Sequence, residues 1–132
     1  MKFFVDNNLP ARMARAFNEH GKPNNSFIHI KYHPDLHQGC SDTEWIKLLA
    51  KEGNWIVLTQ DKNIMKKPAE RAAFETAKLT GFFLDKSWSP LDFWAQLSKL
   101  AQIMPQIIQL AEDSPRGTCF KVPLKAKDIR PL

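Results

Sequence analysis

Short apolar runs alternate along the chain with segments whose apolar residues recur at helical spacing. Residues 2–5 form a short, mostly apolar run that ends on Asp6. Apolar residues then recur along one helix face over residues 9–17, until Gly21 stops the pattern. Pro10 suits the first turn of a helix, because its missing N–H would have no partner there. These patterns predict a strand followed by a helix.

The middle of the chain repeats this order. A polar, proline-containing stretch at residues 22–25 predicts a turn, and the β-branched and aromatic residues at 27–30 predict a second strand before a loop over 33–40. A serine followed three residues later by a glutamate is a capping box, which opens a helix predicted over residues 41–53. The run at 55–59 lacks polar alternation, which is typical of a strand buried on both faces of a parallel sheet.

The last part of the chain is predicted to add a helix, a strand and a longer helix, at about 68–79, at 82–84 and from 89–90 onward. Pro105 lies inside the long helix and should kink or break it, because proline removes a helix hydrogen bond and clashes with the preceding turn. The run at 118–122 predicts an edge strand whose pairing Pro123 limits.

Strands and helices therefore alternate four times, which predicts an α/β fold with a mainly parallel central sheet flanked by helices. The chain has 132 residues and no internal repeats, so residues 1–132 are predicted to form a single domain. In open parallel sheets, ligands bind beyond the carboxyl ends of the strands, near the point where strand order reverses. Acidic residues at those ends are the first candidates for a site.

The composition, with 43% hydrophobic and 25% charged residues, is that of an ordinary globular protein. No apolar stretch is long enough for a signal peptide or a membrane span, and the two cysteines are too few for a disulfide framework. These features predict a cytoplasmic protein without a membrane partner. The net charge of +5, with basic residues clustered after Asp61 and in the C-terminal segment, favours a polyanionic partner.

Four aspartates are placed to converge at the carboxyl edge of the predicted sheet. Asp6 ends the first strand and Asp85 ends the fourth. Asp61 comes just after the third strand, and Asp42 lies in the first turn of the second helix. Carboxylates gathered at one edge repel each other unless a cation neutralises them, and hard oxygen ligands suit Mg²⁺ or Mn²⁺. The pattern predicts a metal site that can activate water against a phosphodiester.

Each acid also has a purely structural interpretation. Asp6, Asp61 and Asp85 would each fit an ordinary polar turn. Asp42 would favour the positive end of its helix dipole, and Glu44 is explained by the capping box. Their joint placement at one edge favours the site.

The histidines and tryptophans give weaker signals. His29, His33 and His37 fall across a strand-to-loop boundary rather than on one helix, so they are not predicted to form a zinc site. The tryptophans fall mostly in apolar runs and are predicted to be core residues. Trp88, in a predicted loop, is the exception that could stack on a nucleic-acid base.

Three segments carry a resemblance to a known family: Phe-Phe-Val-Asp-Asn-Asn-Leu-Pro at 3–10, Ser-Asp-Thr-Glu-Trp-Ile at 41–46, and Ile-Val-Leu-Thr-Gln-Asp-Lys at 56–62. Together they resemble the PIN-like domains related to VapC toxins, which carry an Asp after the first strand, an acid that opens a helix and a Thr-x-Asp after a later strand. The resemblance spans roughly residues 2–85 and implies a PIN-like three-layer sandwich. Residues 90–132, the long helix and basic C-terminal segment, lie outside it.

The resemblance implies a Mg²⁺-dependent (or Mn²⁺-dependent) endoribonuclease in which Asp6, Asp42 and Asp61 are the catalytic, metal-binding residues. Asp85 is the candidate for a fourth metal ligand. The residues expected to support this site are Asn7, Asn8, Thr59 and Glu44.

The resemblance also implies partners. Arg12, Arg15 and Lys62 are the candidates for contacts with RNA phosphates. VapC-type toxins are the toxic half of type II toxin–antitoxin pairs, commonly dimerise and are inhibited by a partner. A protein of this kind is therefore expected to bind RNA and an antitoxin, and a homodimer is a further possibility.

Two other functions compete with this interpretation. A catalytically weak or inactive PIN-like module would bind RNA or a protein partner with the same fold and basic surface. A phosphatase or a receiver domain would use the Asp after the first strand as a phosphate acceptor. The sequence argues against the phosphatase, which needs a second Asp where the chain has Asn8. It also argues against the receiver domain, which needs an acid where the chain has Asn7.

Overall fold

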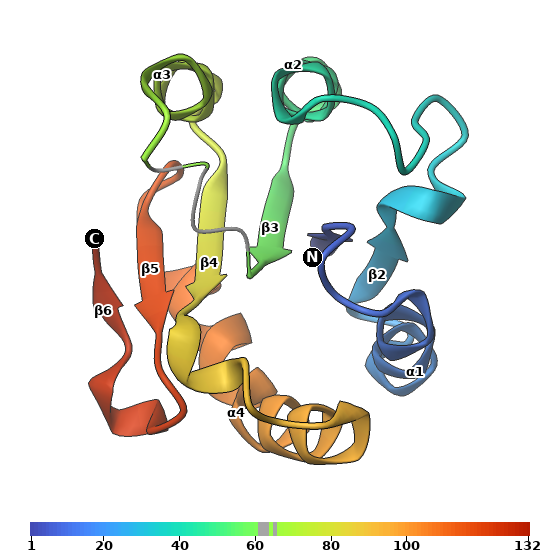
Figure 1. The fold of residues 1–132 in the computed structure, drawn as a ribbon, viewed down its shortest axis with the longest axis vertical. Helices are drawn as coiled ribbons and strands as arrows, with labels where there is room; N and C mark the ends of the chain where they lie inside the picture. The colour runs from blue at the N-terminus through green and yellow to red at the C-terminus, as the bar shows by residue number, and fades with distance from the viewer. Residues whose placement is uncertain (61–63, 65) are drawn as a thin grey trace.

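The computed structural model describes residues 1–60, 64 and 66–132, in which a single six-stranded sheet forms the centre of the molecule (Figure 1). The strands are β1 (Lys2–Val5), β2 (Ser26–His29), β3 (Trp55–Thr59), β4 (Thr80–Leu84), β5 (Cys119–Val122) and β6 (Arg130–Pro131). Their order is β2-β1-β3-β4-β5-β6, and all neighbours are parallel except β5 and β6. The mainly parallel sheet predicted from the sequence is confirmed.

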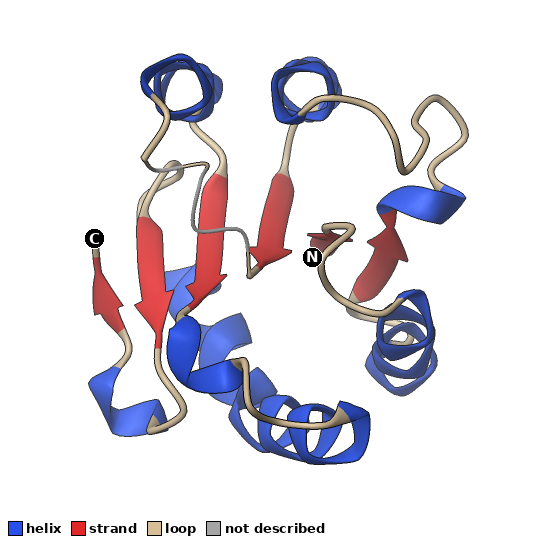
Figure 2. Cartoon of the chain, in the orientation of Figure 1, coloured by secondary structure: helices blue, strands red, loops and turns tan. Residues whose placement is uncertain are grey.

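Helices cover both faces of this sheet, as the blue elements on either side of the red strands show (Figure 2). They are α1 (Ala11–Gly21), α2 (Asp42–Glu52), α3 (Pro68–Ala77) and α4 (Phe93–Asp113). Alternate residues of β1 point to opposite faces. Phe3 packs in the cluster formed with α1 and α4, whereas Phe4 packs in the cluster formed with α2 and α3. The expected three-layer α/β sandwich is therefore present.

Aromatic contacts join β1 to a neighbouring strand and to a helix. Phe4 stacks on Trp45 of α2 with ring centroids 5.0 Å apart, and Phe3 stacks on Phe27 of β2 at 4.5 Å. All four side chains are buried. Such pairs add to the free energy gained from burying apolar area, so they help to hold β1 in the middle of the sheet.

The order of the strands reverses at β1. The chain moves from β1 to β2 on one side and then crosses to β3 on the other side, from which β4 to β6 follow outward. The carboxyl ends of β1 and β3 lie side by side, because Val5 is in register with Leu58. This is the point at which open parallel sheets place their ligands.

The prediction for residues 118–122 was wrong in one respect. β5 is not an edge strand, because it pairs with β4 on one side and with β6 on the other. Pro123 directly follows β5, and the chain then turns through a 3-10 helix (Ala126–Asp128) to bring β6 back. β6 has only two residues, which is too short to leave a strand pattern in the sequence.

The helix and strand limits differ from the predictions at several ends. β2 stops at His29, and Ile30 opens a short 3-10 helix (Ile30–Tyr32). β4 begins earlier than predicted, at Thr80, and α3 ends at Ala77, before Lys78 adopts a left-handed conformation with φ 51°.

The long helix α4 begins at Phe93, where the side chain of Asp92 accepts a hydrogen bond from the Ala95 N–H and caps it. Pro105 lies inside α4 without ending it. Its side chain is exposed, while Met104 and Ile107 on the opposite side of the helix are buried. Packing on the sheet to both sides of Pro105 offsets the loss of one helix hydrogen bond, so the predicted break does not occur.

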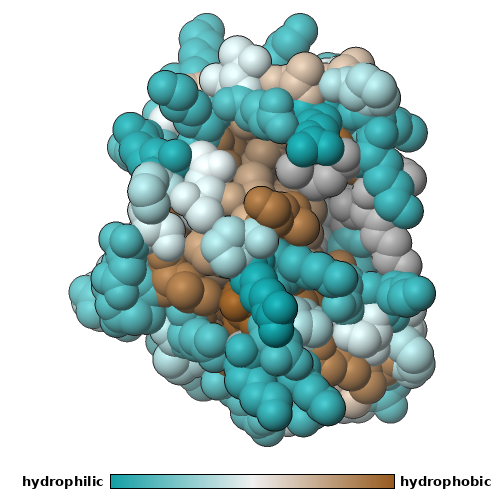
Figure 3. Space-filling model, turned by 90° about the vertical axis from the view of Figure 1, so that its left-hand side faces the viewer, coloured by the Kyte–Doolittle hydropathy of each residue, from teal (hydrophilic) through white to brown (hydrophobic). Residues whose placement is uncertain are grey.

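On the face where β6 ends the sheet, most of the visible surface is polar, but apolar residues gather in its middle (Figure 3). Among the residues that the structure describes, the large apolar side chains that are exposed are Tyr32, Trp94 and Leu132. Within the described part of the chain, no helix has both the length and the apolar character needed to cross a membrane.

Candidate functional site

Several of the predicted site residues come from segments that meet at the carboxyl edge of the sheet. Asp6 directly follows β1, Thr59 is the last residue of β3, and Asp42 is the first residue of α2. Asp6 continues the sheet, because its N–H donates to the Leu58 carbonyl at 3.1 Å. The site thus lies beside the reversal of strand order.

Asp6 is buried, with only 4% of its surface exposed. Its Oδ1 accepts a hydrogen bond from the Asn7 N–H at 2.7 Å, and its Oδ2 accepts one from the Thr59 hydroxyl at 2.9 Å. A buried carboxylate is costly unless it is hydrogen-bonded or paired. These two donors, one in the turn after β1 and one at the end of β3, hold the carboxylate in one orientation.

Asn8 forms a second bridge between the two strand ends. Its Oδ1 accepts a hydrogen bond from the Gln60 N–H at 3.0 Å. The Thr59 hydroxyl also approaches this oxygen, at 3.4 Å, but its single proton already points to the closer Asp6 carboxylate. Asn8 therefore fixes the backbone that follows β3.

A polar cleft opens over these residues, and it contains Asp6, Asn7, Asn8 and Asp42. The other residues that line it are Ile30, Gln38, Cys40 and Trp45. Asp42 accepts a hydrogen bond from the Trp45 indole N–H at 2.9 Å, so its carboxylate too is held in place. The structure therefore brings together two of the predicted acids and both predicted asparagines.

Gln38 and Cys40 were not predicted as site residues. Both lie on the loop before α2, and Gln38 donates from Nε2 to the Asn7 Oδ1 at 2.8 Å. Burial raises the pKa of the Cys40 thiol, which favours its neutral form. The loop has no periodic pattern, and nothing in the sequence marked these two residues.

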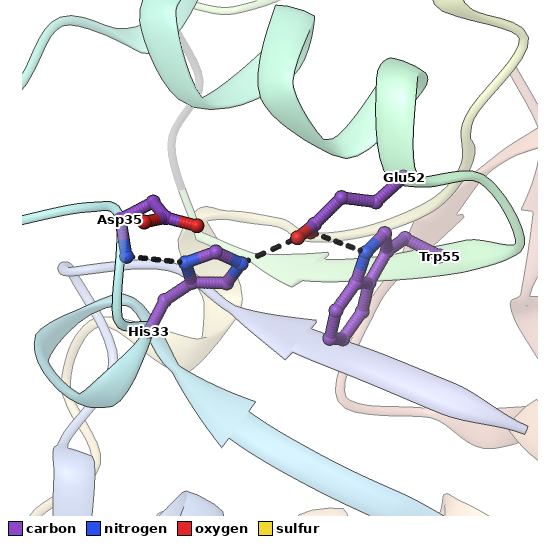
Figure 4. Close-up of polar contacts among 4 residues, drawn as sticks. All are labelled: His33, Asp35, Glu52 and Trp55. Atoms are coloured by element: carbon purple, nitrogen blue, oxygen red, sulfur yellow. Dashed lines mark hydrogen bonds and ion pairs between the residues drawn. The ribbon is translucent and has the colours of Figure 1, made fainter.

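His33 anchors the start of this loop (Figure 4). Its Nδ1 accepts a hydrogen bond from the Asp35 N–H at 3.1 Å, so Nε2 carries the proton and donates to Glu52 at 3.0 Å. The same Glu52 oxygen accepts from the Trp55 indole N–H at 3.0 Å. The loop is thus tied to the end of α2 and the start of β3.

His29 holds the segment after β1 in a similar way. Its Nδ1 accepts from the Lys31 N–H at 3.1 Å, and its Nε2 donates to the Leu9 carbonyl at 2.7 Å. Burial lowers the pKa of His29 below its ordinary value. With both ring nitrogens occupied, His29 and His33 serve as structural links rather than metal ligands.

The remaining predicted residues do not line the cleft. Asp85 follows β4, where its carboxylate accepts from the Ser87 N–H at 2.9 Å and from the Ser87 hydroxyl. Glu44 is exposed on the first turn of α2, and its N–H donates to Ser41 as the capping box predicts. Trp88 was wrongly predicted as a possible stacking residue, because it is 1% exposed and donates to the Val122 carbonyl.

The arginines proposed for phosphate contacts are exposed on α1 and rest on aromatic rings. The Arg12 guanidinium lies 4.0 Å from the centre of the Phe93 ring. Arg15 lies over the Tyr32 ring and donates to its hydroxyl at 3.2 Å. Asp61 and Lys62 lie outside the described residues.

The chemistry of the cleft fits a hard divalent cation in part. Asp6 and Asp42 supply carboxylate oxygens, which are the donors that Mg²⁺ and Mn²⁺ prefer. Among residues 1–60, 64 and 66–132, no group of three or more His, Cys, Asp or Glu is placed to hold a metal ion. The described part of the cleft therefore offers two charged ligands.

Comparison with protein families relates the chain to a known family. A family model described as "PIN like domain" matches residues 1–86. The match covers β1 to β4 and every residue that lines the cleft. No curated protein and no solved structure matches the chain.

Proposed function

The chain belongs to the PIN-like domain family, and we propose that it is a Mg²⁺- or Mn²⁺-dependent endoribonuclease. PIN-like domains are generally nucleases. The observation that supports the proposal best is the cleft itself, where Asp6 and Asp42 lie together although they are far apart in the sequence. The net charge of +5 favours RNA as the substrate, since phosphate contacts by basic residues release counterions.

In this proposal Asp6 and Asp42 hold the metal ion, together with Asp61, which lies outside the described residues. When bound, the metal would lower the pKa of a water molecule and stabilise the leaving oxygen. The contribution of the protein is to orient the ligands. Thr59 fixes the Asp6 carboxylate and the Trp45 indole fixes that of Asp42, so neither has to reorganise.

We further propose that the nuclease is the toxin of a type II toxin–antitoxin pair and acts on cytoplasmic RNA. The sequence resemblance to VapC-type toxins motivates this step. An apolar groove between α1 and α4 offers a place for the antitoxin, because Phe17, Leu97 and Met104 line it together with Trp94, which is 75% exposed. A second copy of the chain is the alternative occupant.

A non-catalytic module that binds RNA or a protein is the second candidate. The observation in its favour is the net charge of +5, which favours a polyanionic partner whether or not the chain cleaves it. The two candidates differ in what metal does. A nuclease needs it for cleavage, whereas a binding module retains its partner in EDTA.

The test is cleavage of a mixed panel of structured RNAs in Mg²⁺ or Mn²⁺, comparing wild type with Asp6→Asn and Asp42→Asn. Each substitution removes one negative charge from the cleft with little change of shape. We expect each to lower the cleavage rate by about 100-fold or more, because a charged metal ligand is lost. EDTA should stop cleavage by wild type.

Asp113→Asn is the matched control, because Asp113 is exposed at the end of α4 and only accepts a hydrogen bond from Gln109. Its activity should equal that of wild type. Cleavage that persists in Asp6→Asn would locate the activity elsewhere. RNA binding without metal-dependent cleavage would favour the binding module.

A further inference from the structure

The orientation of the Asn8 side-chain amide is fixed by its neighbour. The Gln60 N–H lies 3.0 Å from one end of this amide. A backbone N–H can only donate, so the atom that faces it must be the oxygen, Oδ1. The nitrogen, Nδ2, therefore points away from β3.

Nδ2 makes no hydrogen bond to any of the described residues, and Asn8 is exposed and lines the cleft. The neighbouring Asn7 gives no equivalent information, because it pairs with another amide, that of Gln38, and reversing both amides would preserve the contact. For Asn8, in contrast, the structure determines which end of the amide carries the unbonded N–H donors.

A phosphodiester that enters this cleft meets two carboxylates, Asp6 and Asp42, which repel it. A neutral N–H donor attracts a phosphate oxygen without competing for the metal. The amide nitrogen is also unsuited to metal binding, since hard cations take oxygen ligands and the oxygen of Asn8 is already occupied by Gln60.

We propose that Asn8 is a substrate-binding residue that donates from Nδ2 to a non-bridging phosphate oxygen of the RNA. This role rests on the proposed nuclease function and goes beyond it, because it assigns Asn8 to the substrate rather than to the metal. An aspartate in its place would keep the acceptor for Gln60 but would present no donor to the phosphate.

Two variants separate the donor from the other properties of Asn8. Asn8→Asp keeps the bridge to Gln60, removes the donors and adds a charge. Asn8→Ala removes the donors without adding a charge, but it also removes the bridge to Gln60 that Asn8→Asp keeps. Asn24→Asp, in the exposed turn before β2 at the opposite edge of the sheet, is the control for an added charge.

The experiment measures kcat and KM on a fluorogenic single-stranded RNA, together with the Kd for Mn²⁺ in the absence of RNA. In both Asn8 variants we expect KM to rise about 10- to 100-fold, which is the effect of losing one hydrogen bond to a charged group. The affinity for Mn²⁺ should not weaken in either variant. Asn24→Asp should match wild type, and urea unfolding should show that all variants are folded.

A wild-type KM in Asn8→Ala would overturn the assignment, as would weaker Mn²⁺ binding in that variant, which would make Asn8 a metal ligand. An increase confined to Asn8→Asp would also overturn it, because the added charge alone would then explain the effect. If wild type neither cleaves nor binds RNA, the proposed nuclease function itself fails. That result is distinct from a failure of the role of Asn8 in an active enzyme.

Discussion

At the scale of single residues, the site depends on hydrogen bonds that cross from one strand end to the next. Thr59 is fully buried and donates its hydroxyl proton to Asp6. The sequence supplied Thr59 only through the family pattern, because a threonine at the end of an apolar run has no spacing that marks it. Its contact with Asp6 requires the register of β1 against β3, which the sequence does not specify.

We predict that Thr59→Val lowers the free energy of unfolding by about 1.5 to 3 kcal/mol, the usual contribution of a hydrogen bond to a charged group. Valine has nearly the shape of threonine but leaves the Asp6 Oδ2 without this donor. Urea denaturation at neutral pH measures the change. Thr59→Ser retains the hydroxyl and should recover most of the loss. Equal stability of Thr59→Val and wild type would mean that the bond contributes nothing to the fold.

Regular elements predicted where some of the candidate residues lie, whereas the roles of these residues in a site stay predictions. Asp6 and Asp42 were expected at one edge, and both line the cleft. Gln38 and Cys40 were missed, because a loop residue is placed by tertiary contacts rather than by periodicity. The prediction for Trp88 failed for a related reason. Trp88 ends a short 3-10 helix (Lys86–Trp88) that packs against the end of β5, where the indole N–H donates to the Val122 carbonyl and the ring is buried.

At the scale of elements, the loop before α2 is the least regular part of the site, and the buried His33 anchors its start. His33 donates to Glu52, which also accepts from Trp55 (Figure 4). Burial alone would raise the pKa of Glu52, but the hydrogen bonds from His33 and Trp55 outweigh it and lower that pKa below its ordinary value.

We predict that Glu52→Gln lowers the free energy of unfolding by about 1 kcal/mol at neutral pH, because the charge that accepts both hydrogen bonds is lost. The effect should depend on pH. A carboxyl whose pKa is lowered by folding contributes stability in full above its unfolded pKa, here 4.5, and loses it as the pH falls through the folded pKa. The difference from wild type should therefore disappear under acid conditions.

Urea denaturation at neutral pH and at about pH 3 tests this dependence. Glu112→Gln is the control, since Glu112 is exposed on α4 and makes no hydrogen bond or ion pair with the described residues. It should match wild type at both pH values. A destabilisation of Glu52→Gln that persists unchanged in acid would show that the charge of Glu52 is not its cause.

The elements themselves were largely predictable. Each strand that carries the site coincides with an apolar run, because strands buried on both faces leave a continuous signal. β6 was not found, since two exposed residues pair with β5 only after the chain has turned back. Because β6 was missed, β5 was wrongly predicted to be an edge strand. The sequence of a strand does not reveal how many neighbouring strands pair with it.

At the scale of the whole molecule, the part of the chain that matches the family cannot cover its own sheet. The match ends at residue 86, before α4 and β5. Yet the face of the sheet that carries Phe82 and Leu84 is covered largely by α4. Residues 93–132 contribute six buried apolar side chains to this core, namely Leu100, Ile103, Met104, Ile107, Phe120 and Val122. The core on this face therefore depends on residues 93–132, and one domain over residues 1–132 stays a prediction.

We predict that a chain of residues 1–92 does not fold cooperatively. Each buried apolar side chain contributes about 1.5 to 3 kcal/mol to the free energy of unfolding. A chain of residues 1–92 loses all the buried side chains of residues 93–132, and their summed contribution is comparable with the whole stability of a typical domain, about 5 to 15 kcal/mol. Urea denaturation should show no sigmoidal transition, and the dye ANS should bind the uncovered face. A chain of residues 1–129, which loses only β6 and the end, should unfold as the full chain does. A cooperative transition in residues 1–92 would instead mean that the family-matched segment is a domain by itself and that α4 is an addition to it.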